Sequence, residues 1–222
     1  MRFFKIHFLV IFITLGSMLF LYAAPNIAHA KIYTVKVTGD SAGWKLRKDK
    51  NGIKVYTRDH EGKGLLEYRA ITIIETDMDR LVKMIFDVEN YPAWTANCAS
   101  AEIYEVLNDS SWIEYMVTSV PWPIDNRDVV FKFIVTDHSE DYFEAHLTSL
   151  PDAVPEKEKY TRMQDSRGSW TFKKADNDRV EVVHQFYGDP EGNIPNWIVN
   201  MFIVSGPYNT LLNLKELCAD PD

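Results

Sequence analysis

The sequence has few of the residue patterns that mark enzymes. Four of its six histidines follow residue 30, and no two of these have the His-x-x-x-His spacing of a metal site. It also lacks a Gly-x-Ser-x-Gly nucleophile motif and a glycine-rich phosphate-binding loop. These absences argue against zinc peptidases, serine hydrolases and nucleotide-dependent enzymes. We therefore expect no cofactor and no metal.

Cations are also scarce. The chain has 24 Lys and Arg residues against 32 Asp and Glu residues, which gives a formal net charge of −8. Phosphate backbones and anionic lipid headgroups repel such a protein. We therefore expect neither a nucleic-acid partner nor permanent electrostatic adhesion to a membrane, whereas transient membrane contact through apolar residues stays open.

The one long hydrophobic run lies at the N-terminus. Two cations precede an apolar run over residues 8–24, and Ala28, His29 and Ala30 form the small-x-small pattern of a cleavage site. These features predict a signal peptide over residues 1–30, cleavage after Ala30 and export to the periplasm. An uncleaved N-terminal anchor is the alternative, although the run is shorter than the ~20 residues of a spanning helix.

Only two cysteines are present, Cys98 and Cys218. A disulfide between them is chemically permitted in an exported protein, and closing so long a loop would stabilise the fold by about 4–5 kcal/mol on a chain-entropy model. Both residues also suit ordinary packing, and nothing in the sequence brings the two sulfurs together. Their pairing therefore stays open.

No Ser/Gly linker or internal repeat divides residues 31–222, which predicts a single domain. We expect a short helix over residues 40–44 before a hairpin turn at Asn51-Gly52. Helical spacing recurs over residues 78–86 and from Ile194 onward, where Gly206-Pro207 should bend the last helix. Strand patterns cover residues 53–58, 64–75, 101–107, 112–120, 129–136, 142–148, 162–174 and 179–187. This order predicts an α+β fold, with an antiparallel sheet and two helical excursions.

Several short motifs occur in an order that resembles the START (StAR-related lipid transfer) domain family. They are Trp44 with Gly52-Ile-Lys-Val-Tyr56, Asp87-Val-Glu-Asn-Tyr-Pro-Ala-Trp94, Pro121-Trp-Pro-Ile-Asp-Asn-Arg-Asp-Val-Val130 and Tyr187-Gly-Asp-Pro-Glu-Gly-Asn-Ile-Pro195. Their number, order and spacing extend over nearly all of the chain that follows the leader. The resemblance implies a helix-grip fold, in which a curved antiparallel sheet grips a long C-terminal helix and one lipid occupies a tunnel between them.

The resemblance also indicates which side chains would meet a ligand. Large apolar side chains on the strands and the last helix would face the implied tunnel; they are Met116, Phe131, Phe133, Trp197, Met201 and Phe202. A solid core built from the same residues is the alternative, because Phe and Met commonly fill cores. The implied lid combines Trp122, between two prolines, with the bend at Gly206 and Pro207. Trp122 suits either a tunnel mouth or packing under its own loop.

Two charged residues are candidate ligand contacts. Strand alternation places Glu114 on the apolar face that carries Trp112 and Met116, where a carboxylate must find a donor or take up a proton. In sterol-binding START proteins an acid at the matching place pairs with an arginine, and Phe133 holds the arginine's position here. Glu114 is thus free to bind a ligand hydroxyl or to pair with Arg127. Arg127 either faces the tunnel or locks its loop.

These observations predict an exported, monomeric protein that binds and carries one lipid or other hydrophobic molecule without chemistry. An enzyme of the related cyclase type, acting on a hydrophobic substrate in the same cavity, is one alternative. A partner-binding module with a solid core is another.

Overall fold

The computed structural model describes residues 43–60, 64–176, 178–192 and 194–219, except for the side chains of Asn196, Trp197, Asn200 and Met201. The predicted signal peptide and its cleavage site lie outside this range. The strands are β1 (Lys45–Lys50), β2 (Ile53–Asp59), β3 (Leu66–Glu75), β4 (Cys98–Asn108), β5 (Ser111–Thr118), β6 (Arg127–His138), β7 (Tyr142–Ser149), β8 (Thr161–Arg162), β9 (Ser166–Asp176) and β10 (Arg179–Gly188). The α-helices are α1 (Met78–Phe86), α2 (Tyr91–Trp94) and α3 (Asn196–Ala219), and short 3-10 turns cover Val88–Asn90 and Pro151–Ala153.

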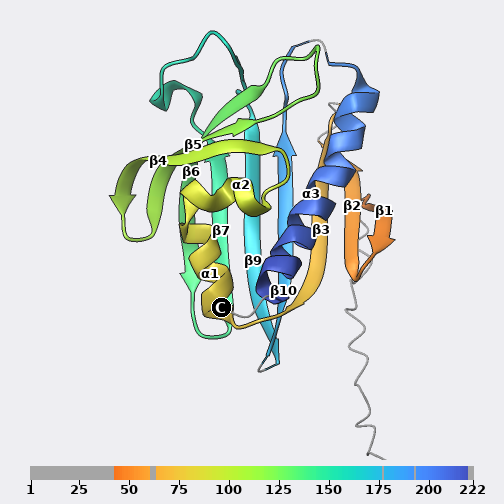
Figure 1. The fold of residues 1–222 in the computed structure, drawn as a ribbon, viewed down its shortest axis with the longest axis vertical. Coiled ribbons are helices and arrows are strands. Elements are labelled where there is room, and N and C mark those ends of the chain that lie inside the picture. Colours follow the sequence, from red (N-terminus) through yellow and green to blue (C-terminus); the bar gives the residue numbers. More distant parts are fainter. Residues whose placement is uncertain (1–42, 61–63, 177, 193, 220–222) are drawn as a thin grey trace, which may run out of the picture. The chain divides into compact units, whose positions relative to one another are not determined.

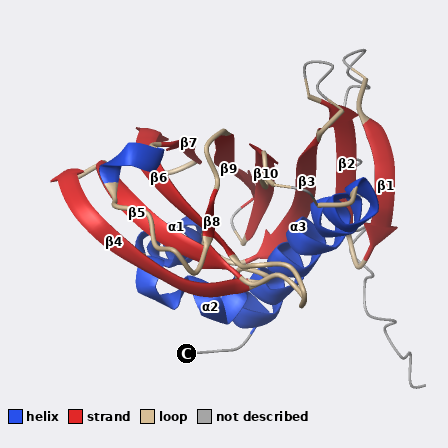
Figure 2. Ribbon diagram, turned by 90° about the horizontal axis from the view of Figure 1, so that it is seen from above, coloured by secondary structure: helices blue, strands red, loops and turns tan. Residues whose placement is uncertain are grey.

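The strands form one curved sheet in the order β1-β2-β3-β10-β9-β7-β6-β5-β4 (Figures 1 and 2). All neighbours along this path are antiparallel, and the two-residue β8 adds a parallel pairing beside β6. Most neighbouring strands are also consecutive in sequence and form hairpins, whereas β3 pairs with β10 across more than a hundred residues of sequence. The predicted α+β helix-grip class is confirmed.

The chain enters the sheet through β1 rather than through a helix. Gly43 and Trp44 are not helical, which corrects the described part of the helix predicted over residues 40–44. The guanidinium groups of Arg58 and Arg69 each lie 4.5 Å from the centroid of the Trp44 ring, and these cation–π contacts hold Trp44 against β2 and β3. The predicted turn is present: both of its central residues have positive φ, 54° at Asn51 and 72° at Gly52.

Helix α1 follows its predicted spacing and buries Met78, Leu81, Val82 and Ile85. Asp77 caps the N-terminus of α1: its carboxylate accepts a hydrogen bond of 2.7 Å from the Arg80 backbone N–H. The Arg80 side chain then donates to the carbonyl oxygen of Leu217, at 2.9 Å, near the end of α3. Helix α1 thereby fixes the last turn of α3.

Helix α3 crosses the concave face of the sheet, where it contacts β2, β3 and α2 (Figures 1 and 2). It is one helix from Asn196 to Ala219, with Pro207 inside it. Its buried Leu211 and Leu214 join the main core with residues from both ends of the sheet. Cys98 and Cys218 are both free, and Cys218 lies 4.0 Å from the Met84 sulfur instead. In the described part of the chain, no helix has the length and apolar character needed to cross a membrane.

Candidate functional site

A cavity of about 250 Å³ lies between α3 and the concave face of the sheet. Strands β3, β5, β6, β7, β9 and β10 supply one wall, α3 the opposite wall, and the segment from α2 to β4 a rim. Apolar side chains make up most of the lining; examples are Met116, Phe131, Leu147, Phe186, Phe202 and Ile203. The volume exceeds the ~150 Å³ cavity that suffices for a benzene-sized molecule. The solid-core alternative is therefore wrong for this region.

Glu114 lines the cavity from β5 and is only 1% exposed. Its carboxylate accepts one hydrogen bond, of 2.8 Å, from the indole N–H of Trp112. Burial raises the pKa of Glu114 from its ordinary value of 4.5 to about 7, although the Trp112 hydrogen bond opposes this shift. The predicted face is confirmed, because Trp112, Glu114 and Met116 alternate toward the concave side.

Phe133 lies further along β6 than the cavity. It is fully buried and stacks on Trp112, with ring centroids 4.3 Å apart and ring planes at 10°. It is absent from the lining, so we correct its predicted place at the ligand: it fixes the indole that donates to Glu114. Phe131, two residues earlier on the same face, does line the cavity. The difference follows from position along the strand, which alternation alone does not fix.

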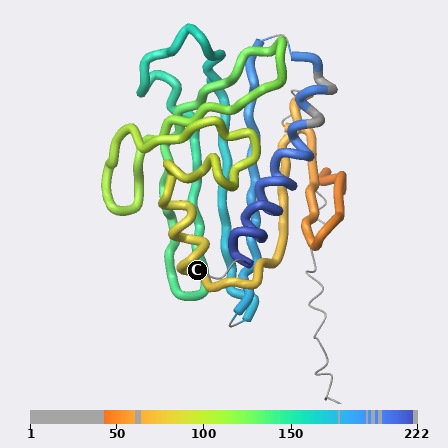
Figure 3. Tube along the Cα trace, in the orientation of Figure 1, coloured from red at the N-terminus to blue at the C-terminus, as the bar shows by residue number. Residues whose placement is uncertain are grey.

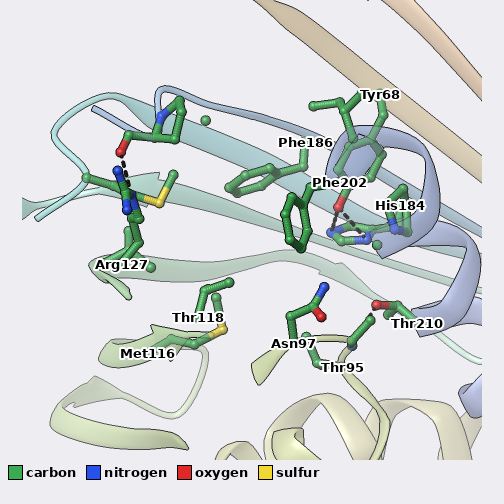
Figure 4. Close-up of a pocket in the computed structure, with 18 of the residues that line it drawn as sticks. Tyr68, Thr95, Asn97, Met116, Thr118, Arg127, His184, Phe186, Phe202 and Thr210 are labelled. Carbon is green, nitrogen blue, oxygen red and sulfur yellow. Dashed lines mark hydrogen bonds between the residues drawn. The ribbon is translucent and has the colours of Figure 1, made fainter. Parts of the chain in front are cut away.

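Arg127 performs both of the roles that the sequence left open. It lines one end of the cavity, where its Nε donates to the carbonyl oxygen of Pro190 at 2.9 Å and an Nη to that of Glu191 at 3.1 Å (Figure 4). It also donates to the backbone oxygen of Asp125. Within the described residues it makes no ion pair with Glu114. Arg127 therefore joins the loop before β6 to the loop that leads into α3.

Asp128 points to the opposite face of β6, as adjacent strand residues should. Its carboxylate accepts hydrogen bonds from Arg162, at 2.8 Å, and from the Tyr115 hydroxyl, at 3.0 Å. Arg162 also donates to the carbonyl oxygen of Val154, at 2.9 Å. This buried pair holds the long segment between β7 and β8 against the convex side of the sheet, away from the cavity.

The predicted lid residues lie at the same end as Arg127 or along α3. Trp122 is 92% exposed, so the alternative in which its ring packs under its own loop is wrong. The loop that carries it runs beside the connection from β10 to α3 (Figure 3). Gly206 and Pro207 line the cavity, as does Phe202 from the same helix. The side chains of Trp197 and Met201 lie outside the described residues.

Comparison with known proteins identifies the family. The family model described as START domain matches residues 28–217. The chain belongs to the START domain family. An uncharacterized protein of Pseudomonas aeruginosa is 30% identical over 86% of this chain and 94% of its own length. The phosphatidylcholine transfer protein of mouse is 24% identical, over 86% and 90% respectively.

A solved START structure agrees with this fold. The crystal structure of a STAR-related lipid transfer protein fragment from Xanthomonas axonopodis superposes with a TM-score of 0.73 and 32% identity, over 80% of this chain and 99% of that one.

One polar pair in the cavity of this START domain, Tyr68 and His184, was not among the residues predicted from the sequence. The Tyr68 hydroxyl lies 3.1 Å from His184 Nδ1, and the His184 ring stacks on Trp170 with centroids 3.7 Å apart. All three residues line the cavity, and Tyr68 and His184 lie at the end opposite Arg127 (Figure 4). Alternation with Val182 and Phe186 is enough to place His184 on the inward face of β10, but inward residues of this sheet meet either core or cavity. Among the described residues, no cluster suited to a metal ion occurs.

Proposed function

We propose that this protein binds one lipid or other hydrophobic molecule in the cavity beneath α3 and transfers it without chemical change. The observation that carries the proposal is an apolar cavity of about 250 Å³ between the sheet and the long helix of a START domain. The relatives named as phosphatidylcholine transfer protein and STAR-related lipid transfer protein support the same ligand class.

The energy of binding comes mainly from burial of an apolar chain. Each methylene transferred from water into apolar surroundings contributes about 0.8 kcal/mol, so a chain of about sixteen carbons contributes on the order of 12 kcal/mol before ordering costs. A single uncharged hydrogen bond contributes only about 1 kcal/mol. Affinity then depends on the apolar wall, and selectivity on Glu114, Arg127 and the mouth of the cavity.

Ligand exchange occurs at the end of the cavity that Arg127 closes. Release of its bonds to Pro190 and Glu191 would separate the two loops, and Gly206-Pro207 would let the first half of α3 move. Trp122 enters the surface of a bilayer during this step, because its exposed ring is amphipathic. The protein acts as a monomer in transient contact with membranes, and nucleic acid is not a partner.

Occupation of the cavity is tested with a variant that fills it. Met116→Trp replaces a flexible thioether chain with a bulky indole ring inside the cavity and should abolish uptake of a fluorescent long-chain fatty acid. Native mass spectrometry of the purified wild type should show a bound small molecule. Val106→Trp adds the same ring at a strand position that is 67% exposed, and serves as the control. Equal uptake by all three proteins would refute a ligand site beneath α3.

We further propose that residues 1–30 are a signal peptide and that the mature protein works in the periplasm. Expression of the full chain in a Gram-negative host, followed by cell fractionation and intact-mass measurement, tests this. The expected product begins at Lys31 and appears in the periplasmic fraction. A full-length product in the membrane fraction would instead support an uncleaved anchor.

A further inference from the structure

The pair formed by Tyr68 and His184 is held rigidly in the wall of the cavity. Tyr68 on β3 and His184 on β10 are diagonal neighbours on paired strands, because Tyr68 pairs with Phe186 and His184 with Ala70. The Trp170 ring, directly opposite on β9, stacks on the imidazole with ring planes at 5°. Contact on the ring face and on the ring edge therefore fixes the imidazole before any ligand arrives.

Both members of the pair are uncharged. Burial lowers the pKa of His184 from 6.5 to about 3, so the imidazole stays neutral at physiological pH. Burial also raises the pKa of Tyr68, so its hydroxyl keeps its hydrogen. The pair therefore has two hydrogens that can be donated, one on the Tyr68 hydroxyl and one on the His184 imidazole.

One of these two hydrogens has no good acceptor within the described residues. If the Tyr68 hydroxyl donates to Nδ1, at 3.1 Å, the hydrogen on Nε2 is left with the Tyr68 oxygen at 3.5 Å, which is too far for a normal hydrogen bond. If the ring N–H donates to the Tyr68 oxygen instead, the phenol hydrogen is left over. In either tautomer, one donor remains for whatever occupies the cavity.

The surroundings of the pair select an uncharged acceptor. Arg127, the lone Arg or Lys among the described lining residues, lies at the opposite end beyond Phe186 and Phe202 (Figure 4), so an anion beside His184 would be buried without a counter-charge. A ligand hydroxyl has a stronger acceptor in the carboxylate of Glu114. A carbonyl oxygen accepts a hydrogen bond and brings no hydrogen of its own.

We propose that Tyr68 and His184 bind the ester carbonyl oxygen of an acyl lipid. This assignment rests on the proposed function and adds the linkage chemistry of the ligand. The acyl chain attached to that carbonyl would run along Phe186 and Phe202. The protein would therefore distinguish ester-linked lipids from ether-linked lipids of the same headgroup and chain length.

The test compares two phosphatidylcholines that differ only in the linkage of their chains, since the ether lipid lacks both ester carbonyl oxygens. A diacyl lipid and the matched dialkyl ether lipid each displace a fluorescent long-chain fatty acid from the wild-type protein. We expect the ester to bind about 3- to 10-fold more tightly, the effect of one uncharged hydrogen bond. Tyr68→Phe with His184→Phe removes both donors, keeps an aromatic ring at each position and should bring the ratio to about 1. Thr118→Val, which removes a hydroxyl elsewhere in the lining, should leave the ratio unchanged.

Equal affinities in the wild type, or an unchanged ratio in the double variant, would overturn the inference. If the fluorescent fatty acid binds but neither phosphatidylcholine displaces it, the inference fails and the proposed function stands. If the fatty acid itself does not bind, the proposed function fails as well, so the two failures are distinct. Nitrogen-15 NMR of the histidine rings in the wild type needs no variant: the ring N–H signal of His184 should shift with the diester and not with the diether.

A long-chain isoprenoid quinone is the third competitor. If the double variant weakens the quinone and leaves the ester unaffected, the site binds ring ketones and the ester assignment is wrong.

Discussion

Glu114 is a carboxyl group with one neutral donor and no cation among its described partners. Its cross-strand neighbours on β6, Phe131 opposite and Phe133 diagonal, carry no charge, and Phe133 stacks on the Trp112 indole that donates at 2.8 Å. An indole hydrogen bond compensates only part of the cost of burying a carboxylate. The raised pKa of Glu114, about 7, follows from this shortage of donors.

This pKa predicts a pH-dependent stability that Glu114→Gln should remove. In the unfolded chain Glu114 ionises near 4.5, whereas in the folded protein it keeps its proton up to about pH 7. Stability should therefore fall as pH rises through this window, by about 3 kcal/mol in total for this group, and remain lower above it. Urea unfolding from pH 4.5 to 8 measures the effect. A constant difference between the variant and wild type across this range would contradict it.

Helix α3 combines two features at one point. Gly206 and Pro207 both line the cavity, and a side-chain carbon placed on Gly206 would meet no atom within 4 Å. Glycine has a low helix propensity and proline removes a backbone hydrogen bond, so the helix is weakest beside the ligand space. Its C-terminal half is fixed to α1 through Arg80 and to α2 through Asn213. Motion of the helix should therefore start at Gly206 and involve the N-terminal half.

Gly206→Ala should strengthen α3 at this point and slow its movement. The substitution is expected to raise the free energy of unfolding by up to about 1 kcal/mol, because alanine favours helix and meets no neighbour. It should also slow lipid transfer between vesicles. Asn209→Ala, at an exposed position of the same helix, is the control and should stabilise without slowing transfer. Transfer at the wild-type rate by Gly206→Ala would rule out the hinge.

At the scale of the whole molecule, the closed end of the cavity carries the most exposed large apolar side chain of the described residues. Trp122 is 92% exposed, beside Val120 and Arg127 of the cavity lining. The chain is acidic, with a formal net charge of −8, so electrostatic attraction to an anionic membrane is weak. Insertion of an amphipathic ring is then the main means by which this end could meet a bilayer.

Trp122→Ala should therefore reduce transfer without reducing binding. We expect the rate of transfer between uncharged vesicles to fall several-fold, while affinity in solution and the unfolding free energy change little, since the ring contacts almost nothing in the folded protein. Tyr104→Ala, at a 51% exposed position on β4, is the matched control. A loss of solution affinity in Trp122→Ala would show that the ring acts on the ligand instead.

Local chemistry was enough to place most elements. Alternation and turn residues located the hairpins from β4 to β10, and the change of period located α1 and α3. Strand β1 was not predicted, and Gly43 and Trp44 of the helix predicted over residues 40–44 are not helical, because the cation–π contacts of Trp44 with Arg58 and Arg69 bridge residues far apart in sequence. The signal peptide and the side chains of Trp197 and Met201 lie outside the described residues, so those predictions stay untested.

The sequence by itself determined which residues face inward, because side-chain direction in a strand or helix follows from local periodicity. It also determined the family, through motifs whose order survives at low identity. Only the tertiary structure decided which inward residues border empty space. Phe131 and Phe133 share one face of β6, yet one lines the cavity and the other packs on Trp112, and His184 became a cavity residue through Tyr68 and Trp170 from two other strands. The physical reason is that a cavity is a property of the distance between two packed layers, which no single segment encodes.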